Sequence, residues 1–164
     1  MATISIPGWK KLHQLIEPED IYGTKEEGFG KETNPHVTIL FGFKDGDDIA
    51  RKLQDELPVD KPLEIPFTAL SYFETKDCDV VKFDVESEDL NRLNKWCTDN
   101  FEYTNEFKDY HPHVTLAYVK KGTGKKYARK MSYPAISTTD KLVYSRPDKT
   151  KLRWTIGDDK EKAS

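Results

Sequence analysis

Apolar residues recur along this chain in patterns that predict six strands. Two segments, 36–43 and 113–119, are rich in β-branched and aromatic residues, which is typical of buried strands. Residues 63–75 and 79–86 alternate apolar and polar residues, as a half-buried strand does, and two short segments flank the turn at 146–149. The predicted strands are 36–43, 63–75, 79–86, 113–119, 141–145 and 151–156. In the third of them, Val81, Phe83 and Val85 share one face.

Helical spacing appears in two places between these strands. One helix can be capped by Asp45 or Asp47 and is ended by Pro58, while a second begins at the N-cap Ser87. The apolar positions are Ile49, Leu53 and Leu57 in the first helix and Leu90, Leu93, Cys97 and Phe101 in the second. Each stripe predicts a helix that packs one face on a sheet. A short basic helix is expected after Gly124.

The two ends of the chain have weaker patterns. Trp9–Ile16 has helix-like apolar spacing, but three glycines follow, so residues 1–35 are expected to be irregular, with a mobile charged loop before Asn34. The charged tail 158–164 is expected to fray. A length of 164 residues suits a single domain spanning residues 1–164.

The order of strand, helix, strand and strand occurs twice between these ends. This order predicts an α+β fold of two similar lobes instead of one long parallel sheet. The repeat is also visible in the letters, because PHVTILF at 35–41 aligns with PHVTLAY at 112–118.

Composition narrows the function. The net charge of −3 argues against sequence-independent binding to long nucleic acid. There is neither an apolar run long enough for a membrane span nor a secretory signal in Met1–Lys10, so a cytosolic location is expected. Cys78 and Cys97 are interpreted as ordinary thiols. Residues 120–130 contain six cationic side chains and no acidic one, which would attract a small anion, although a solvated basic loop would have the same composition.

The repeated His-Val-Thr motif is the strongest chemical signal. A repeated core would account for its valines, but it would not account for a histidine and a threonine at the same positions twice. Because residues i and i+2 of a strand share a face, His36 lies beside Thr38 and His113 beside Thr115, opposite the apolar positions. Two imidazoles can act as the acid and the base of phosphodiester cleavage, and two hydroxyls can hold the non-bridging oxygens. This chemistry requires no metal and no cofactor.

These residues resemble the 2H phosphoesterase superfamily, which is defined by two His-x-Thr motifs; here the two histidines are 77 residues apart. The stretches NPHVTILFG and YHPHVTLAYVKKG look like the phage-encoded anti-CBASS group, which cleaves cyclic oligonucleotide immune messengers. The resemblance implies a bilobal sheet around a central cleft. It also implies that His36 and His113 are acid and base, and that Thr38 and Thr115 bind phosphate.

The resemblance thus predicts hydrolysis of 3′–5′ linkages in cyclic di- or trinucleotides inside a host bacterium. A free ribose 2′-OH would be the nucleophile, and a 2′,3′-cyclic phosphate would form first. Phe73 and Tyr144 are candidates for stacking on bases, and Lys120, which opens the basic segment, is a candidate phosphate contact. The expected partner is a small phosphodiester; neither duplex nucleic acid, membrane nor an obligate protein partner is indicated.

Three alternatives stay open. The first is a metal site built from His111 and His113 with His13 or Asp109, although no third ligand has a recognisable spacing. The second is a non-catalytic sponge that binds cyclic nucleotides, and the third is a phosphodiesterase for 2′,3′-cyclic phosphates or RNA ends. The fragment 122–125 lacks the spacing of a phosphate loop and is discounted.

Overall fold

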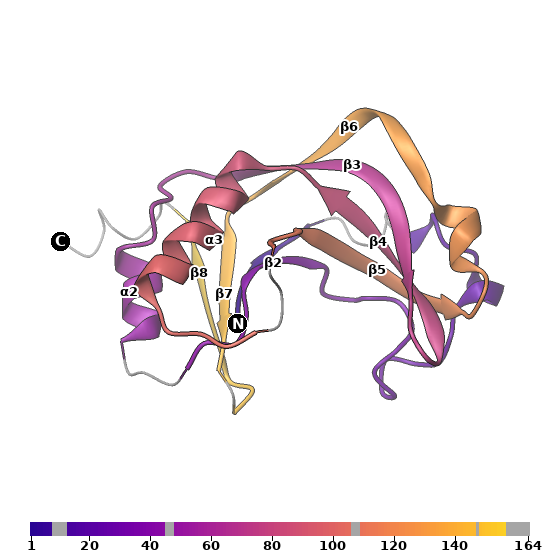
Figure 1. Cartoon of the computed structure of the whole chain (residues 1–164), viewed down its shortest axis with the longest axis horizontal. Helices are drawn as coiled ribbons and strands as arrows, with labels where there is room; N and C mark the ends of the chain where they lie inside the picture. Colours follow the sequence, from indigo (N-terminus) through magenta and orange to yellow (C-terminus); the bar gives the residue numbers. More distant parts are fainter. Residues whose placement is uncertain (8–12, 45–47, 106–108, 147, 157–164) are drawn as a thin grey trace.

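A computed structural model describes residues 1–7, 13–44, 48–105, 109–146 and 148–156. Within these ranges the strands form one eight-stranded sheet in the order β6-β3-β4-β5-β2-β1-β7-β8 (Figure 1). Every pairing in it is antiparallel. The strands are β1 (Ala2–Ser5), β2 (His36–Leu40), β3 (Leu63–Glu74), β4 (Cys78–Val85), β5 (His113–Lys120), β6 (Arg129–Thr139), β7 (Lys141–Ser145) and β8 (Lys151–Thr155). The helical elements are η1 (Pro18–Asp20), α2 (Ile49–Asp55), α3 (Glu88–Asn100) and η2 (Gly124–Tyr127).

The two motif strands, β2 and β5, lie side by side at the centre of the sheet. Beyond β5 come β4, β3 and β6, and beyond β2 come β1, β7 and β8, so three strands flank each motif strand. The predicted α+β class and two-halved architecture are therefore confirmed. The two halves are not continuous in sequence, because β3 and β4 follow β2 along the chain but lie on the β5 side of the sheet.

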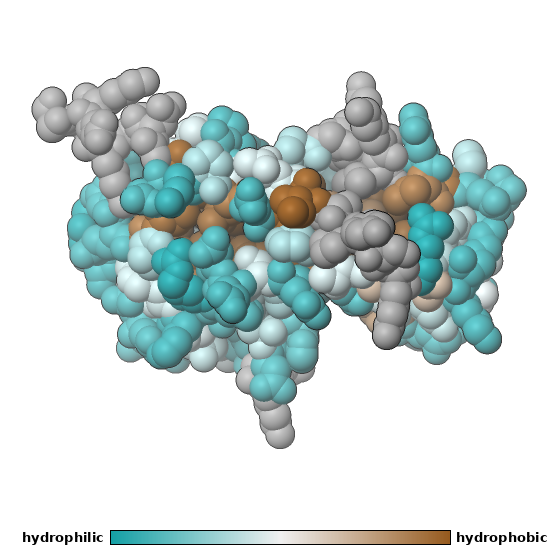
Figure 2. All heavy atoms as spheres, turned by 90° about the horizontal axis from the view of Figure 1, so that it is seen from above, coloured by the Kyte–Doolittle hydropathy of each residue, from teal (hydrophilic) through white to brown (hydrophobic). Residues whose placement is uncertain are grey.

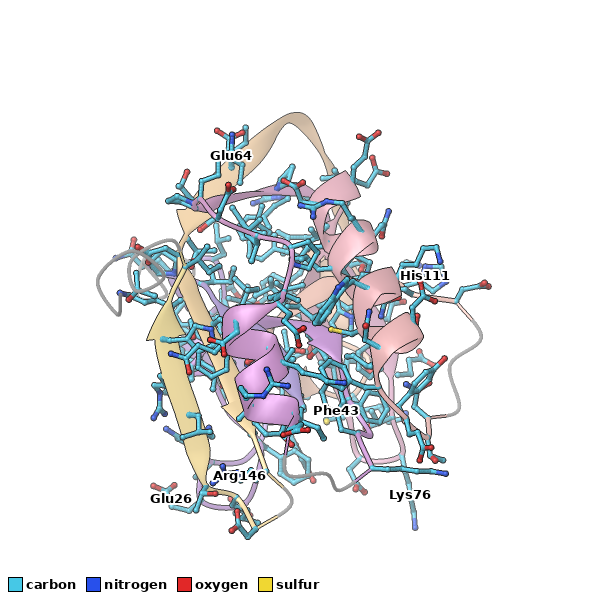
Figure 3. All side chains as sticks on the ribbon, turned by 90° about the vertical axis from the view of Figure 1, so that its left-hand side faces the viewer. Glu26, Phe43, Glu64, Lys76, His111 and Arg146 are labelled. Atoms are coloured by element: carbon cyan, nitrogen blue, oxygen red, sulfur yellow. The ribbon has the colours of Figure 1, made fainter. Side chains whose placement is uncertain are left out.

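The hydrophobic core lies between the sheet and the two helices. Figures 1 and 3 show α2 and α3 next to each other on one side of the molecule. The predicted stripe of α3 is buried at Leu90, Leu93 and Cys97, and Asn94 Nδ2 donates to the Ile39 carbonyl of β2 at 2.8 Å. Each fully buried leucine contributes roughly 1.5–3 kcal/mol relative to an exposed one, so this face holds the helix on the sheet.

Local capping agrees with the sequence where the structure describes it. Ser87 Oγ accepts a hydrogen bond from the Leu90 amide at 3.1 Å, as predicted for an N-cap. The N-cap of α2 is Asp48, whereas the predicted caps Asp45 and Asp47 lie outside the described residues, as does Trp9. The basic helix after Gly124 is present as the 3-10 helix η2.

Two strands were not predicted. Strand β1 is only four residues long, yet it sits between β2 and β7 and pairs with both. Strand β6 is an edge strand paired with β3, and the pairing is interrupted between Lys130 and Ala135, the stretch that contains Pro134. Proline is tolerated at such an edge because it cannot donate to the sheet.

The irregular N-terminal segment is attached to β5 instead of forming a free loop. Tyr22 N donates to Tyr118 O at 2.9 Å, and Tyr118 N donates to Gly30 O at 2.8 Å. The segment thus pairs with the half of β5 that β2 does not reach. Both cysteines are buried and free, which confirms their assignment as thiols.

Hydrophilic residues dominate the face seen in Figure 2, where apolar side chains form a broken band along the long axis. No helix within the described ranges combines the length and apolar character needed to cross a membrane.

Candidate active site

The register between β2 and β5 brings the two motifs together. Val37 faces Val114 across the antiparallel pair. In that register His36 lies opposite Thr115, and Thr38 lies opposite His113. A local twofold axis through the valine pair therefore relates one motif to the other.

All four motif side chains lie on the same face of the sheet. The intervening residues Val37, Ile39, Val114 and Leu116 are 0% exposed on the opposite face. The two histidines and two threonines are half-buried, so a ligand can reach them. We call their side of the sheet the motif face. Directly opposite residues there are about 5 Å apart at Cβ and diagonal ones about 7–8 Å, so the two imidazoles, which are diagonal, can converge on one phosphate group.

Each imidazole is oriented by the same backbone contact. His36 Nδ1 lies 2.9 Å from the Asn34 carbonyl oxygen, and His113 Nδ1 lies 3.2 Å from the His111 carbonyl oxygen. A carbonyl oxygen can only accept, so Nδ1 carries the proton in both rings. In the neutral ring Nε2 is then left with its lone pair, as a general base requires.

A β-bulge lies directly after the second motif. The register of β4 against β5 shifts between Val81 and Lys82, which leaves Leu116 as an extra residue in β5. Bulges redirect a strand and often occur beside functional sites. Here the strand pairs with β2 before the bulge and with the N-terminal segment after it.

The electrostatic surroundings of His113 favour its neutral form. Burial is the largest effect and lowers the pKa of His113, and the charges of Lys82 and His36 act in the same direction. The His111 carbonyl and Asp84 oppose this and raise the pKa, but the net direction is downward. An imidazole that is unprotonated at neutral pH is suited to accept a proton.

Three polar residues next to the second motif were not found from the sequence. Lys82 faces Thr115 and Asp84 faces His113, and both lie on the motif face. Lys82 Nζ donates to Asp84 Oδ1 at 2.5 Å and to Ser71 Oγ at 2.7 Å. The alternation that turns Val81, Phe83 and Val85 inward was a signal that the intervening residues face the other way.

The structure separates the three further residues predicted to bind substrate. Phe73 lies two residues after Ser71 in β3, so it is also on the motif face, and it is 43% exposed. Tyr144 is only 5% exposed and packs edge to face on Phe43 in the core, which contradicts its predicted role in base stacking. Lys120 is exposed at the far end of β5, about 17 Å along the strand from Thr115, too far to join the motif residues.

Two lysines of the basic segment make contacts of their own. Lys126 forms ion pairs with Glu17 and Asp20, and Lys121 Nζ donates to the Thr75 carbonyl at 2.6 Å. These contacts favour the structural interpretation of the segment over phosphate attraction.

His13 and His111, two of the ligands that the alternative metal site would need, lie in different surroundings. His111 projects outward beside α3 (Figure 3), and His13 Nε2 is within 2.6 Å of the Glu32 carbonyl oxygen. In the described parts of the chain, no three His, Cys, Asp or Glu side chains form a group that could hold a metal ion.

Comparison with known proteins identifies the family. The sequence matches the 2′-5′ RNA ligase superfamily over residues 8–151. The fold is similar to the crystal structure of TT0787 of Thermus thermophilus, with a TM-score of 0.56 and 12% identity over 97% of this chain and 100% of that one. It is also similar to the crystal structure of a phosphoesterase, with a TM-score of 0.52 and 11% identity over 96% and 99%. No curated protein matches the sequence significantly. The chain therefore belongs to the 2′-5′ RNA ligase superfamily of 2H phosphoesterases and is a phosphodiesterase.

Proposed function

We propose that this phosphodiesterase hydrolyses 3′–5′ linkages of cyclic di- or trinucleotide messengers, with His36 and His113 as acid and base. The observation that carries the proposal is the twofold-related placement of two imidazole–hydroxyl pairs on one face of the sheet. Within a phage-infected bacterium such an activity would remove the messenger that triggers CBASS defence.

The first step is an in-line transesterification. One Nε2 removes the proton of a ribose 2′-OH, whose oxygen forms a new bond to the adjacent phosphorus. The bond from phosphorus to O5′ breaks, and the other imidazole, in its protonated form, donates a proton to that oxygen. Thr38 and Thr115 donate hydrogen bonds to the non-bridging oxygens, where negative charge accumulates. The product is a 2′,3′-cyclic phosphate, which water opens with the two histidines in exchanged roles.

Two features favour a nucleotide substrate. Phe73 offers an exposed aromatic ring on the motif face, on which a base can stack. The net charge of −3 and the internal pairing of Lys126 argue against a long polyanion. No metal or cofactor takes part in this mechanism.

The family description favours a second candidate, because it names a 2′-5′ RNA ligase. The same four residues could open a 2′,3′-cyclic phosphate at an RNA end without taking part in immune evasion.

The test is a substrate panel followed by product analysis. The protein is incubated with cyclic dinucleotides, cyclic trinucleotides and an RNA ending in a 2′,3′-cyclic phosphate, in buffer with and without a strong chelator, and the products are separated by chromatography. We expect cleavage of a cyclic oligonucleotide that the chelator does not affect, with no cleavage where the neighbouring 2′-OH is absent. Turnover of the RNA end alone would establish the second candidate. Intact ligand recovered in a stoichiometric complex would refute both candidates in favour of a sponge.

A further inference from the structure

The four motif residues are related by a twofold axis, but their neighbours are not. On the β5 side, Lys82 faces Thr115 and Asp84 faces His113. On the β2 side, the equivalent strand is β1.

There the equivalent positions hold uncharged residues. Thr3 faces Thr38, and Ser5 faces His36. One half of the site is thus bordered by an ammonium and a carboxylate, and the other half only by hydroxyls. A phosphate held at the twofold axis would therefore have two different environments for its two non-bridging oxygens.

Lys82 is held in one place by its partners. Its side chain is 19% exposed, and Ser71 Oγ also donates to Asp84 Oδ1, at 2.8 Å, so the three groups form a closed triangle. Because the three groups support one another, the entropic cost of fixing the flexible lysine side chain is lower. That cost is what usually makes surface ion pairs weak.

The triangle uses two of the three donors that an ammonium carries. Lys82 and Thr115 stand directly opposite each other on neighbouring strands. Their Cβ atoms are therefore about 5 Å apart, and the lysine side chain is long enough to reach an anion bound to the threonine hydroxyl.

We propose that Lys82, positioned by Asp84 and Ser71, is a substrate-binding residue that donates to the non-bridging phosphate oxygen on the Thr115 side. This inference rests on the proposed function, because it takes the phosphate to lie between the two motifs. It makes the site distinguish the two non-bridging oxygens of a phosphodiester. Ser71 and Asp84 are positioning residues, since they act on the substrate only through Lys82.

The first experiment measures binding of inorganic phosphate by ³¹P NMR titration. Lys82→Met should weaken binding about 10- to 100-fold, the usual range for losing a charge-assisted hydrogen bond. Lys76→Met is the matched control, because Lys76 is an exposed lysine in the β3–β4 turn that projects away from the sheet (Figure 3) and carries the same charge. Lys82→Arg should recover part of the binding. Equal effects of Lys82→Met and Lys76→Met would overturn the proposal.

A second variant tests whether misfolding causes the loss of phosphate binding. Lys82→Met leaves Asp84 without its cation, whereas Lys82→Met/Asp84→Asn removes both charges and keeps the net charge. The double variant should melt close to the wild-type temperature and still bind phosphate poorly. Wild-type phosphate affinity in a folded double variant would refute the role of Lys82.

The decisive readout is a stereospecific sulfur effect. The two phosphorothioate diastereomers of whichever substrate the wild type cleaves should react at different rates, and Lys82→Met should shrink that difference several-fold, because the contact to one oxygen is gone. A rate ratio unchanged by the substitution would refute the proposal while leaving the His-dependent activity intact. Conversely, a wild type without turnover, whose phosphate binding still depends on Lys82, would refute the proposed function and retain the anion site.

Discussion

Gly42, two residues after the end of β2, has the least room for a side chain among the glycines that the structure describes. Its φ is +84°, and a Cβ there would lie 3.0 Å from the Thr104 carbonyl carbon and closer still to its oxygen. Thr104 N donates to Gly42 O at 2.8 Å, and Phe43 bridges to Tyr103, so this contact fixes the segment that leads toward the second motif. Gly42→Ala should therefore disturb both the fold and the approach of the two motifs.

The magnitude can be worked out by comparison with Gly28→Ala. Gly28 has a φ of +87°, and a Cβ at that position would have nothing within 4 Å, so alanine there costs only the left-handed backbone, about 1–2 kcal/mol. Gly42→Ala has the same backbone cost and in addition must break the hydrogen bond to Thr104, which adds about 1–3 kcal/mol. At about 2–4 °C per kcal/mol for a chain of this size, its melting temperature should fall on the order of 10 °C.

Calorimetry or circular dichroism melts of the two variants, with phosphodiesterase rates on the same samples, provide the assay. Gly42→Ala should lose more stability than Gly28→Ala, and it should lose activity even at temperatures where it is folded. Equal melting temperatures for the two variants would refute the close approach of residues 41–44 to residues 102–105.

Two further predictions concern the surroundings of the motifs. Tyr110→Phe removes the hydrogen bond that the hydroxyl donates to the Thr38 carbonyl at 2.6 Å, so it should destabilise the protein by about 1–2 kcal/mol in denaturant melts; an unchanged midpoint would contradict that contact. Because the folded pKa of His113 is below its unfolded value of 6.5, the unfolded chain takes up a proton first as the pH falls. The contribution of the neutral ring to stability is thus fully present above pH 6.5 and is lost as the pH falls through the folded pKa. Between pH 7.5 and pH 5, wild type should lose more free energy of unfolding than His113→Gln, and equal losses would contradict the shift.

Much of the fold could be predicted from local pattern. The motif strands, the pair β3 and β4, and the capped helix α3 all have a clear period and clear ends, and each is present in the structure. Strand β1 has four residues, too few to establish a period, and β6 contains Pro134, which normally argues against a strand. Both form because of neighbours that are distant in sequence.

The residues of the candidate site also divide into those that a local pattern predicts and those that depend on strand pairing. The motif residues repeat in the letters, so the sequence alone selected His36 and His113. Lys82 is important only because β4 lies beside β5 in one register, and no local pattern contains that information. The predicted role of Tyr144 in base stacking was wrong for the same reason, since the face on which an aromatic residue lies depends on which strands flank it.

The central claim is that two imidazoles act on one phosphorus atom. It is tested most directly by initial rates of His36→Ala, His113→Ala and the double variant, on the substrate that the wild type cleaves. Each single substitution should lower turnover by about a hundredfold or more, and the double variant should be little slower than either, because the two groups act in one step. Thr38→Ala and Thr115→Ala should cost less. Near-wild-type turnover by either histidine variant would contradict the account.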